Sequence, residues 1–366
     1  MAPVSEKSIL IVGGGIVGLC LGVVAQARGF DTTLITRDAA LDTASGVAAG
    51  MIAPALEALV DADPVTAFQR LKTAQGAWLS HFDLWPQAVQ RVLAEGMSKV
   101  ALYTWESDFN PAGTNETVRP LMEAMGAAFL WLDDDALRLE GLDPEGESAI
   151  RVRDDWVVEA AAILQALAAG FAALGGKTMH GTVASVAGDG VILADGSELH
   201  AAHVIVAGGY GSNAFAAAVP SLQALTPIKG HLLDLPGRRG QGVTRSARGY
   251  LADYGVSAKF GASMEPGRDD LAIDPAIVAD LKARAKTLFP DMSLDAAAPR
   301  TGIRASTPDG WPLIGLDGLS GVWVAVGMRR NGYVFAPFAA EVILDRIEGW
   351  ARPDAEVYDP QRFVRP

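Results

Sequence analysis

Residues 8–19 read SILIVGGGIVGL, and this stretch decides the fold class. It opens with a short, continuous apolar run, which is typical of a central strand in a parallel sheet. Gly13, Gly15 and Gly18 follow at the spacing G-x-G-x-x-G. In such a turn the first glycine permits the tight bend, the second lets a pyrophosphate approach the backbone, and the third lets a helix pack closely on the strand.

A helix and a second strand complete this unit. Residues 16–28 show the apolar periodicity of a helix that ends at Gly29, and TTLIT at residues 32–36 is a β-branched strand. Ile16 and Val17 lie at the start of the helix, where the backbone N–H groups and the helix dipole favour anionic phosphates. The order of strand, glycine turn, helix and strand therefore predicts a Rossmann-type dinucleotide-binding unit rather than a structural turn.

The end of the second strand departs from the usual pattern. A carboxylate there normally accepts hydrogen bonds from the ribose hydroxyls, but this chain has Thr36 and Arg37, and Asp38 comes two positions late. The Thr36 hydroxyl is a weaker acceptor than a carboxylate, and the Arg37 guanidinium suits a 2′-phosphate. Both residues are candidate nucleotide contacts, and NADP stays open as the nucleotide on this unit alone.

Composition narrows the class of protein. A chain of 366 residues suggests two domains. With 43 acidic and 30 basic side chains its net charge is −13, so it repels nucleic acid and anionic membranes, and neither is an expected partner. A single cysteine, Cys20, excludes an intramolecular disulfide, and the five histidines lack a metal-binding spacing, so no metal is expected. No stretch suits a signal peptide or a membrane span, which predicts a cytoplasmic protein.

A second glycine-rich strand lies far along the chain. Residues 201–211 read AAHVIVAGGYG, an apolar strand that ends at Gly208 and Gly209, and these two glycines join the candidate cofactor contacts. A strand that returns to the nucleotide unit after a long excursion indicates a discontinuous domain. We therefore expect a dinucleotide-binding domain at residues 1–85, 151–225 and 300–366 and a substrate domain at residues 86–150 and 226–299.

Two C-terminal stretches place basic residues beside glycines. RTGIRASTPDGWPLIG occupies residues 300–315, and VWVAVGMRRNGYVFAP occupies residues 322–337. The second is an apolar strand that ends at Gly327 and runs through a basic loop into an expected helix at residues 338–347. A strand, a basic loop and a helix start direct backbone N–H groups at an anion. Further helices are expected at residues 63–82, 86–95, 157–174 and 274–289.

The chain as a whole resembles the D-amino-acid oxidase superfamily of flavoproteins and, within it, the glycine oxidase-like branch. Four stretches carry the resemblance, in the family's order and from end to end: GGGIVGL at 13–19, ASGVAAGMIAP at 44–54, GIRASTPDGWPLIG at 302–315 and GMRRNGYVFAP at 327–337. The resemblance implies non-covalent FAD. It also implies an α/β fold in which a Rossmann-like, discontinuous FAD-binding domain joins an α+β substrate domain built on an antiparallel sheet.

The resemblance further implies roles for individual residues. It places the pyrophosphate at the first glycine turn and the adenine at the backbone of Val183. Arg304 would pair with the substrate carboxylate, Tyr250 would close over that carboxylate, and Arg330 joins them as a catalytic candidate. The implied contacts of the flavin ring and the site are Ser45, Ala49, Gly50, Met51, Gly302, Gly327, Arg330, Asn331, Gly332 and Tyr333.

Chemistry supports the assignment of Arg304. A planar guanidinium binds a carboxylate bidentately, which fixes the substrate Cα–H toward the flavin. The structural alternative for Arg304 is a buried salt bridge between the two domains, and for Tyr250 it is simple packing on a strand. Met328 and Arg329 replace the histidine and aromatic residue of the glycine oxidase pattern, so Arg329 is either a solvated loop charge or a group that recognises a second carboxylate. Gly302 stands where the sarcosine oxidase branch has a flavin-linking cysteine, which excludes covalent attachment through sulfur there.

The sequence thus predicts FAD-dependent oxidation of a small amine-bearing carboxylic acid, of the glycine, D-amino acid or N-alkylglycine type. The Cα hydride would pass to flavin N5, and the resulting imine would hydrolyse to an oxo acid. Oxygen or another acceptor would take the electrons. Two alternatives stay open: oxidation of a non-amine substrate such as a 2-hydroxy acid, and a flavin-binding module without turnover. The oligomeric state is open as well, a homo-oligomer included.

Overall fold

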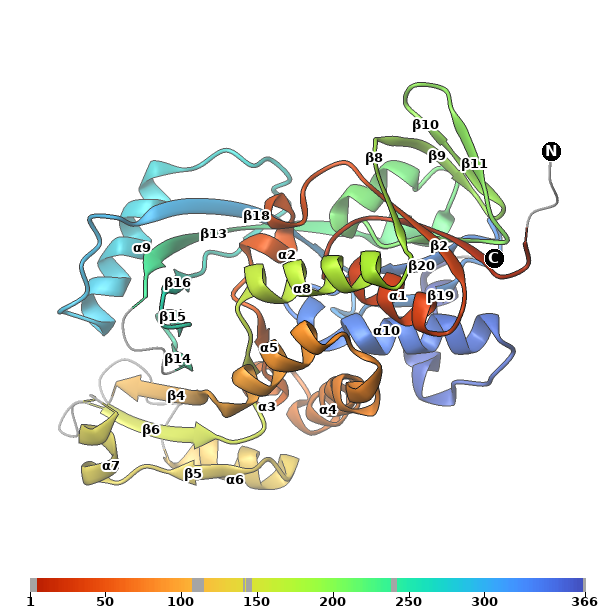
Figure 1. Cartoon of the computed structure of the whole chain (residues 1–366). Coiled ribbons are helices and arrows are strands. Elements are labelled where there is room, and N and C mark those ends of the chain that lie inside the picture. The colour runs from red at the N-terminus through yellow and green to blue at the C-terminus, as the bar shows by residue number, and fades with distance from the viewer. Residues whose placement is uncertain (1–4, 107–114, 141, 143–146, 238–241, 365–366) are drawn as a thin grey trace.

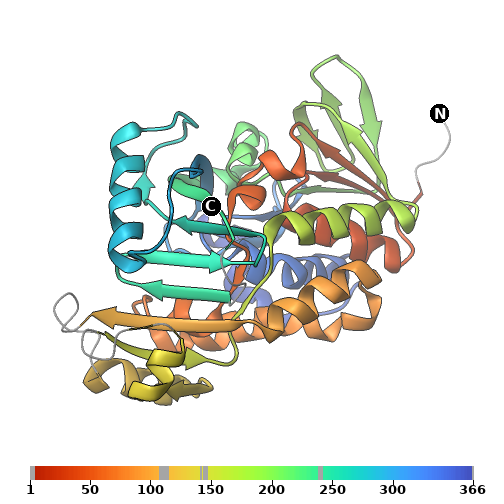
Figure 2. The same ribbon diagram turned by 60° about the vertical axis from the view of Figure 1, so that its left-hand side comes forward.

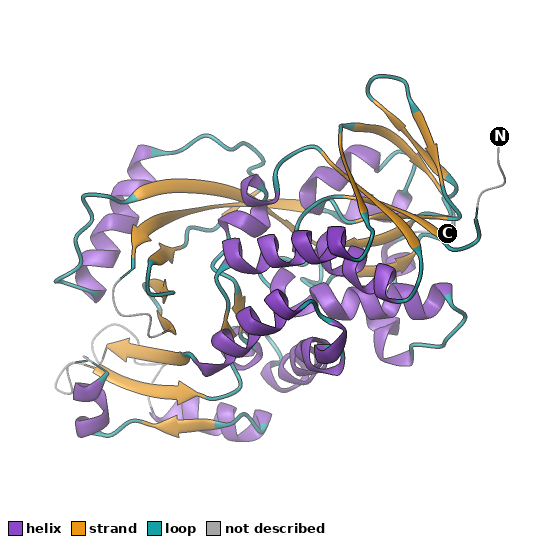
Figure 3. Cartoon of the chain, viewed as in Figure 1, coloured by secondary structure: helices purple, strands orange, loops and turns teal. Residues whose placement is uncertain are grey.

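The computed structural model describes residues 5–106, 115–140, 142, 147–237 and 242–364 (Figure 1). Two large sheets organise the chain, one of six strands and one of nine, beside smaller sheets of three and two strands. Figure 3 shows a group of helices in the middle of the view, with strands on either side. Within the described residues no helix is both long and apolar enough to cross a membrane.

The six-stranded sheet carries the predicted βαβ unit. β1 (Ser8–Val12), α1 (Ile16–Ala27) and β2 (Asp31–Thr36) follow one another, and β1 pairs with β2 in parallel. β12 (His203–Val206), the predicted second glycine-rich strand, lies on the other side of β1 and is also parallel to it. Both predictions are confirmed. The full order is β19-β20-β12-β1-β2-β8, which includes β8 (Lys177–His180), β19 (Leu313–Leu316) and β20 (Trp323–Val326).

Close packing explains the glycines of the first turn. A Cβ atom on Gly18 would lie 1.8 Å from the carbonyl oxygen of Gly13, so a larger residue would push α1 off the sheet. Gly13 itself has a φ of 127°, which residues with a Cβ rarely adopt. The helix is buried along most of its length, against α8 (Ala160–Ala173) and α10 (Gly332–Ile347).

The nine-stranded sheet has the order β17-β13-β16-β15-β14-β4-β6-β5, and β18 also pairs with β13. Its pairs are antiparallel except for β14 and β4, as expected for a substrate domain built mainly on an antiparallel sheet. Figure 2 shows these strands with a helix, α9 (Pro275–Leu288), along their outer side. The strands are β4 (Val100–Glu106), β5 (Phe129–Trp131), β6 (Glu147–Val152), β13 (Thr226–Pro236), β14 (Gly242–Ser246), β15 (Gly249–Asp253), β16 (Ser257–Gly261), β17 (Glu265–Pro266) and β18 (Ala298–Ser306).

The domain boundaries expected from the sequence stay a prediction. The last of them, at residue 300, falls inside β18, which pairs along its whole length with β13 of the nine-stranded sheet. β18 therefore brings the motif at residues 302–315 from one sheet toward the other.

Four expected helices are confirmed, with ends shifted by up to three residues: α4 (Pro64–Ser80), α5 (Gln87–Ser98), α8 and α9. α8 starts later than expected because Val157 belongs to β7 (Trp156–Val157), which pairs with β3 (Met51–Ile52). The other short elements are α2 (Ala44–Val47), α3 (Pro54–Ala58), α6 (Asn115–Met125), α7 (Asp134–Leu139), β9 (Val183–Ala187), β10 (Gly190–Leu193) and β11 (Glu198–His200).

The last long helix, α10, begins at Gly332, so the start expected at Phe338 is wrong. Pro337 is the cause, because a proline inside a helix lacks the N–H that would bond to the carbonyl four residues earlier. Here that carbonyl belongs to Tyr333, and it accepts a hydrogen bond of 2.8 Å from Trp78 Nε1 instead. A tertiary contact thus replaces the missing helix bond, and the N-terminus of α10 comes to lie directly after the basic loop.

Candidate cofactor and substrate site

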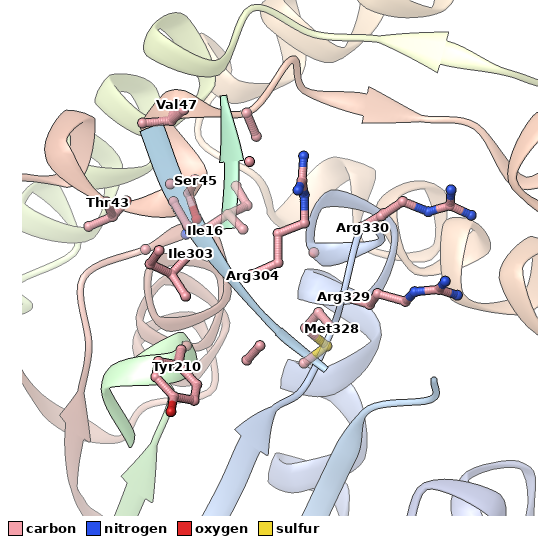
Figure 4. Close-up of a pocket in the computed structure, with 18 of the residues that line it drawn as sticks. Ile16, Thr43, Ser45, Val47, Tyr210, Ile303, Arg304, Met328, Arg329 and Arg330 are labelled. Carbon is pink, nitrogen blue, oxygen red and sulfur yellow. Dashed lines mark hydrogen bonds between the residues drawn. The ribbon is translucent and has the colours of Figure 1, made fainter. Parts of the chain in front are cut away.

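Residues of both large sheets line one cavity of about 720 Å³, a volume typical of small-molecule sites. Figure 4 shows Ile16 and Ser45 on one side of it and Arg329 and Arg330 on the other, with Arg304 between them. Most of the predicted site residues line this cavity. They are Gly13, Gly15, Ile16, Val17, Thr36, Arg37, Ser45, Ala49, Gly50, Met51, Val183, Gly208, Gly209, Tyr250, Gly302, Arg304, Gly327, Arg330, Gly332 and Tyr333.

Two predicted cofactor residues are not among those that line the cavity. Gly18 lies within α1, on the side that faces the glycine turn, where it permits the close approach of the helix to the backbone of Gly13. Asn331 is the N-cap of α10, and its carbonyl accepts hydrogen bonds from the backbone of Val334 and Phe335. Both residues therefore help to set the shape of the site without lining the cavity.

At one end of the cavity the glycine turn meets the start of α1. The Ile16 N–H donates a hydrogen bond of 3.0 Å to Ser45 Oγ, which ties the residue 44–51 segment to the helix N-terminus. The buried Thr36 hydroxyl donates to the carbonyl of Asp38 at 2.8 Å and keeps lone pairs for a ligand. Arg37 is exposed and forms an ion pair with the Asp38 carboxylate at 2.8 Å.

The middle of the cavity is walled by the segment from Ser45 to Met51. Two of its carbonyls are fixed by tyrosine side chains, because the Tyr333 hydroxyl donates to Ser45 O at 2.7 Å and the Tyr254 hydroxyl donates to Ala49 O at 2.6 Å. Burial raises the pKa of both phenols well above its usual value, so both stay protonated donors. These contacts fix the wall along which a flat ring could lie.

At the far end, Arg304 projects from β18. Its Nη1 atom donates to the carbonyl of Ser263 at 3.3 Å, and a Cβ on the facing Gly230 would lie only 2.3 Å from that nitrogen. Burial lowers the pKa of Arg304, which nevertheless stays a cation. Among the described residues, no carboxylate lies within ion-pair distance of its guanidinium, so the salt bridge considered from the sequence is not formed there.

Tyr250, on β15, reaches the same end of the cavity. Its backbone pairs with Gly261 of β16, and its hydroxyl oxygen lies 3.1 Å from the position of a Cβ on that glycine. Burial raises the pKa of Tyr250, although the charge of Arg304 works in the opposite direction. The phenol is therefore neutral near pH 7 and can donate a hydrogen bond beside Arg304.

A buried carboxylate, which sequence reasoning missed, joins this end. Glu57, in α3, is 6% exposed at its side chain; its Oε1 accepts from Arg245 Nη1 at 2.8 Å, and its Oε2 lies 2.9 Å from Arg330 Nε. Burial alone would raise the pKa of Glu57, but the charges of Arg245 and Arg330 outweigh it and hold the pKa below its usual value. The available signal was a lone glutamate in the apolar run APALEALV at residues 53–60, which begins at the end of the 44–54 motif.

A second polar cluster, formed by His231, Glu265 and Ser263, lies next to Arg304. His231 has no exposed surface; its Nδ1 lies 2.8 Å from Glu265 Oε1, and its Nε2 accepts from the backbone N–H of Asp274 at 3.0 Å. The Ser263 hydroxyl donates to the same Glu265 oxygen at 2.6 Å and accepts from the backbone N–H of His231 at 2.8 Å. This group holds Ser263, whose carbonyl accepts from Arg304.

Known proteins are similar to the chain over most of its length. Residues 8–346 match a family model described as FAD dependent oxidoreductase. A glycine oxidase of Bacillus licheniformis is 26% identical over 357 residues, which cover 93% of this chain and 92% of that protein. The bifunctional protein ThiO/ThiG of Synechocystis sp. is 26% identical over 384 residues, and the chain, matched over 98% of its length, spans 54% of that longer relative. Among solved structures, the glycine oxidase of Geobacillus kaustophilus superposes with a TM-score of 0.83 at 22% identity, covering 98% of this chain and 99% of that one.

Proposed function

The chain belongs to the family of FAD-dependent oxidoreductases, and from this we propose that it oxidises a small carboxylic acid that carries an amine. The proposed substrate is of the glycine, D-amino acid or N-alkylglycine type. The observation that carries the proposal is the Arg304 guanidinium, a partly buried cation at the cavity wall with no carboxylate partner among the described residues. Such a cation is costly unless a ligand supplies the opposite charge, and a substrate carboxylate does so.

The first end of the cavity fits FAD. Gly13 and Gly15 present bare backbone, and the N-terminus of α1 supplies N–H groups and the positive end of a dipole. We assign the pyrophosphate to this turn, the adenine to the backbone of Val183, and the flavin ring to the wall at residues 45–51 and the N-terminus of α10. When bound, the flavin supplies the redox chemistry that no side chain provides, which is acceptance of a hydride from the substrate carbon.

Arg304 and Tyr250 orient the substrate. The guanidinium binds both oxygens of the carboxylate, because its parallel N–H groups match the spacing of those oxygens. The Tyr250 hydroxyl donates a further hydrogen bond to the same carboxylate. With the carboxylate fixed at one end, the Cα–H is directed toward the wall at residues 45–51, and positioning of this kind can supply much of the rate.

The surrounding charge also sets the protonation of the amine. Arg304, Arg329 and Arg330 make this end of the cavity electropositive, so a substrate ammonium loses its proton more readily there than in water. The substrate therefore binds with a neutral amine, whose nitrogen lone pair assists departure of the hydride from Cα. No side-chain base is needed for this step.

This last point favours an amine over a 2-hydroxy acid. A hydroxyl group keeps its proton near pH 7, so its oxidation requires a base. The described residues that line the cavity include no histidine. At this end of the cavity, Glu57 is already paired with two arginines, and Asp269 is exposed to solvent. The name of the Bacillus licheniformis relative, a glycine oxidase, supports the same choice.

The experiment is anaerobic reduction of the flavin. The purified holoprotein is mixed with glycine, sarcosine, D- and L-amino acids and 2-hydroxy acids, and the flavin absorbance is followed. We expect bleaching by an amine class, with release of ammonia or an alkylamine, and admission of air then separates reaction with oxygen from reaction with another acceptor. Bleaching by hydroxy acids alone, or by nothing on the panel, would overturn the proposal.

A further inference from the structure

Positive charge exceeds negative charge at the substrate end of the cavity. Besides Arg37 at the other end, six arginines line the cavity, and two of these are Arg248 and Arg284. The four that interact with the charge of Glu57 are Arg245 from β14, Arg304 from β18, and Arg329 and Arg330 from the loop between β20 and α10. Among the described lining residues at this end, the buried Glu57 faces them, and the other carboxylate, Asp269, is exposed to solvent.

Glu57 pairs with two of these four cations. Its two oxygens pair with Arg245 at 2.8 Å and with Arg330 at 2.9 Å. The carboxylate of the proposed substrate compensates a third, Arg304. Arg329 then remains, and within the described part of the chain no carboxylate lies within ion-pair distance of its guanidinium.

The backbone of Arg329 is unusual as well. Its φ of 51° makes it the one non-glycine residue with a positive φ among those described, and residues with a Cβ adopt this conformation at a cost. Its N–H donates a short hydrogen bond of 2.7 Å to the carbonyl of Ala305, the residue after Arg304 on β18. Strained backbone of this kind is typically kept where it serves a site.

The strained loop aims Arg329 and Arg330 in the same direction, as Figure 4 shows. Burial lowers the pKa of Arg304, and the charge of Arg329 lowers it further, so the two cations repel one another. Repulsion between two partly buried cations is relieved most fully by a ligand with a negative group for each of them.

We propose that the cavity accepts an amine with two acidic groups, a dicarboxylic amino or imino acid, whose first carboxylate binds Arg304 and whose second binds Arg329. This inference rests on the proposed function and names its substrate class. Glu57 serves it by pairing with Arg330 and Arg245, which leaves Arg304 and Arg329 as the two cations without a carboxylate partner among the described residues. A substrate with one carboxylate leaves Arg329 without a counter-charge.

The test compares matched substrates that differ by one carboxylate: sarcosine with iminodiacetate, and alanine with aspartate in both enantiomers. We expect the dicarboxylic member to have the higher kcat/KM in the wild-type enzyme. Arg329→Gln should raise the KM for that member by about 10- to 100-fold, as loss of a charge-assisted hydrogen bond does, and change the KM for the monocarboxylic member by less than about 3-fold. Arg329→Gly, which favours a positive φ, should give the same result without a folding defect.

A binding measurement separates the two proposals. Dissociation constants for malonate and acetate are taken from the shift in flavin absorbance, without turnover, in wild type, Arg329→Gln and a control, Arg138→Gln, on the exposed helix α7. We expect only Arg329→Gln to weaken malonate selectively. If malonate binds selectively but no amine reduces the flavin, the proposed function fails and the anion site stands. If amines reduce the flavin while Arg329→Gln affects acetate and malonate equally, or the wild type prefers monocarboxylates, the second-carboxylate site is refuted.

Discussion

Replacing Arg304 by alanine removes the group on which the proposed function depends. The guanidinium lies at the cavity wall, with Ser263 O at 3.3 Å and no ion-pair partner among the described residues, so its strongest interactions are free for a ligand. Truncating one member of a desolvated charge pair costs about 3–5 kcal/mol. At 1.36 kcal/mol per tenfold, kcat/KM should fall by about 10²- to 10⁴-fold.

The assay is the anaerobic reduction of the flavin by the best substrate, followed by stopped-flow absorbance at several substrate concentrations. Arg304→Lys keeps the charge but loses the planar fork, so its loss should be intermediate, about 10-fold. Arg300→Ala is the matched control, because Arg300 lies on the same strand, is not among the residues that line the cavity, and donates to the carbonyl of Leu41 at 2.8 Å.

The unfolding free energy of Arg304→Ala shows whether Arg304 forms a structural salt bridge or binds a ligand. An arginine held in a structural salt bridge would cost several kcal/mol of unfolding free energy when truncated. An arginine kept for a ligand should cost much less, about 1 kcal/mol from lost packing. An Arg304→Ala protein that kept its kcat/KM but lost several kcal/mol of stability would refute the reasoning.

Three further predictions concern residues around Arg304. Tyr250→Phe should raise KM by about 2- to 10-fold with little change in kcat, because one hydrogen bond to the carboxylate is lost; an unchanged KM in steady-state assays would contradict this role. Glu57→Gln should lower the unfolding free energy by about 3–5 kcal/mol, because two partly buried arginines lose their counter-charge; a loss below about 1 kcal/mol in urea titration would show that the pair is dispensable. Asp155 is fully buried and its carboxylate accepts from the N–H groups of Ala55 and Leu56 at 2.9 Å, yet burial raises its pKa to about 7. Since the folded pKa of Asp155 lies above the unfolded value, the folded state holds the proton more tightly than the unfolded state. The unfolding free energy should therefore fall by roughly 4 kcal/mol, relative to that of Asp155→Asn, as pH rises from about 4 to about 7. Parallel pH profiles of the two proteins would exclude this raised pKa.

Local patterns in the sequence were sufficient to predict the glycine turn at one end of the cavity. The glycine turn is fixed by contacts a few residues apart, as between Gly13 and Gly18, and a spacing motif records such contacts directly. Arg304 was found because it lies inside a continuous motif at residues 302–315. The absence of a carboxylate partner for Arg304 among the described residues, however, depends on the placement of β13 and β18 and could not be predicted from the motif.

The missed features depend on partners far apart in the chain. Glu57 and Arg245 are 188 positions apart and belong to no shared motif, so only the fold brings α3 to β14. The start of α10 was misplaced for a similar reason, because the carbonyl left unbonded by Pro337 is satisfied by Trp78, 255 positions before Tyr333. Tertiary hydrogen bonds of this kind override the local rules on which such predictions depend.

The most direct test of the account is a crystal structure of the FAD-loaded protein with a bound carboxylate inhibitor such as acetate. The account predicts FAD with its pyrophosphate on the turn at Gly13 and Gly15, and an acetate that receives two hydrogen bonds from Arg304 and one from Tyr250. An acetate bound elsewhere, or an Arg304 paired with a carboxylate of the protein itself, would contradict the central claim.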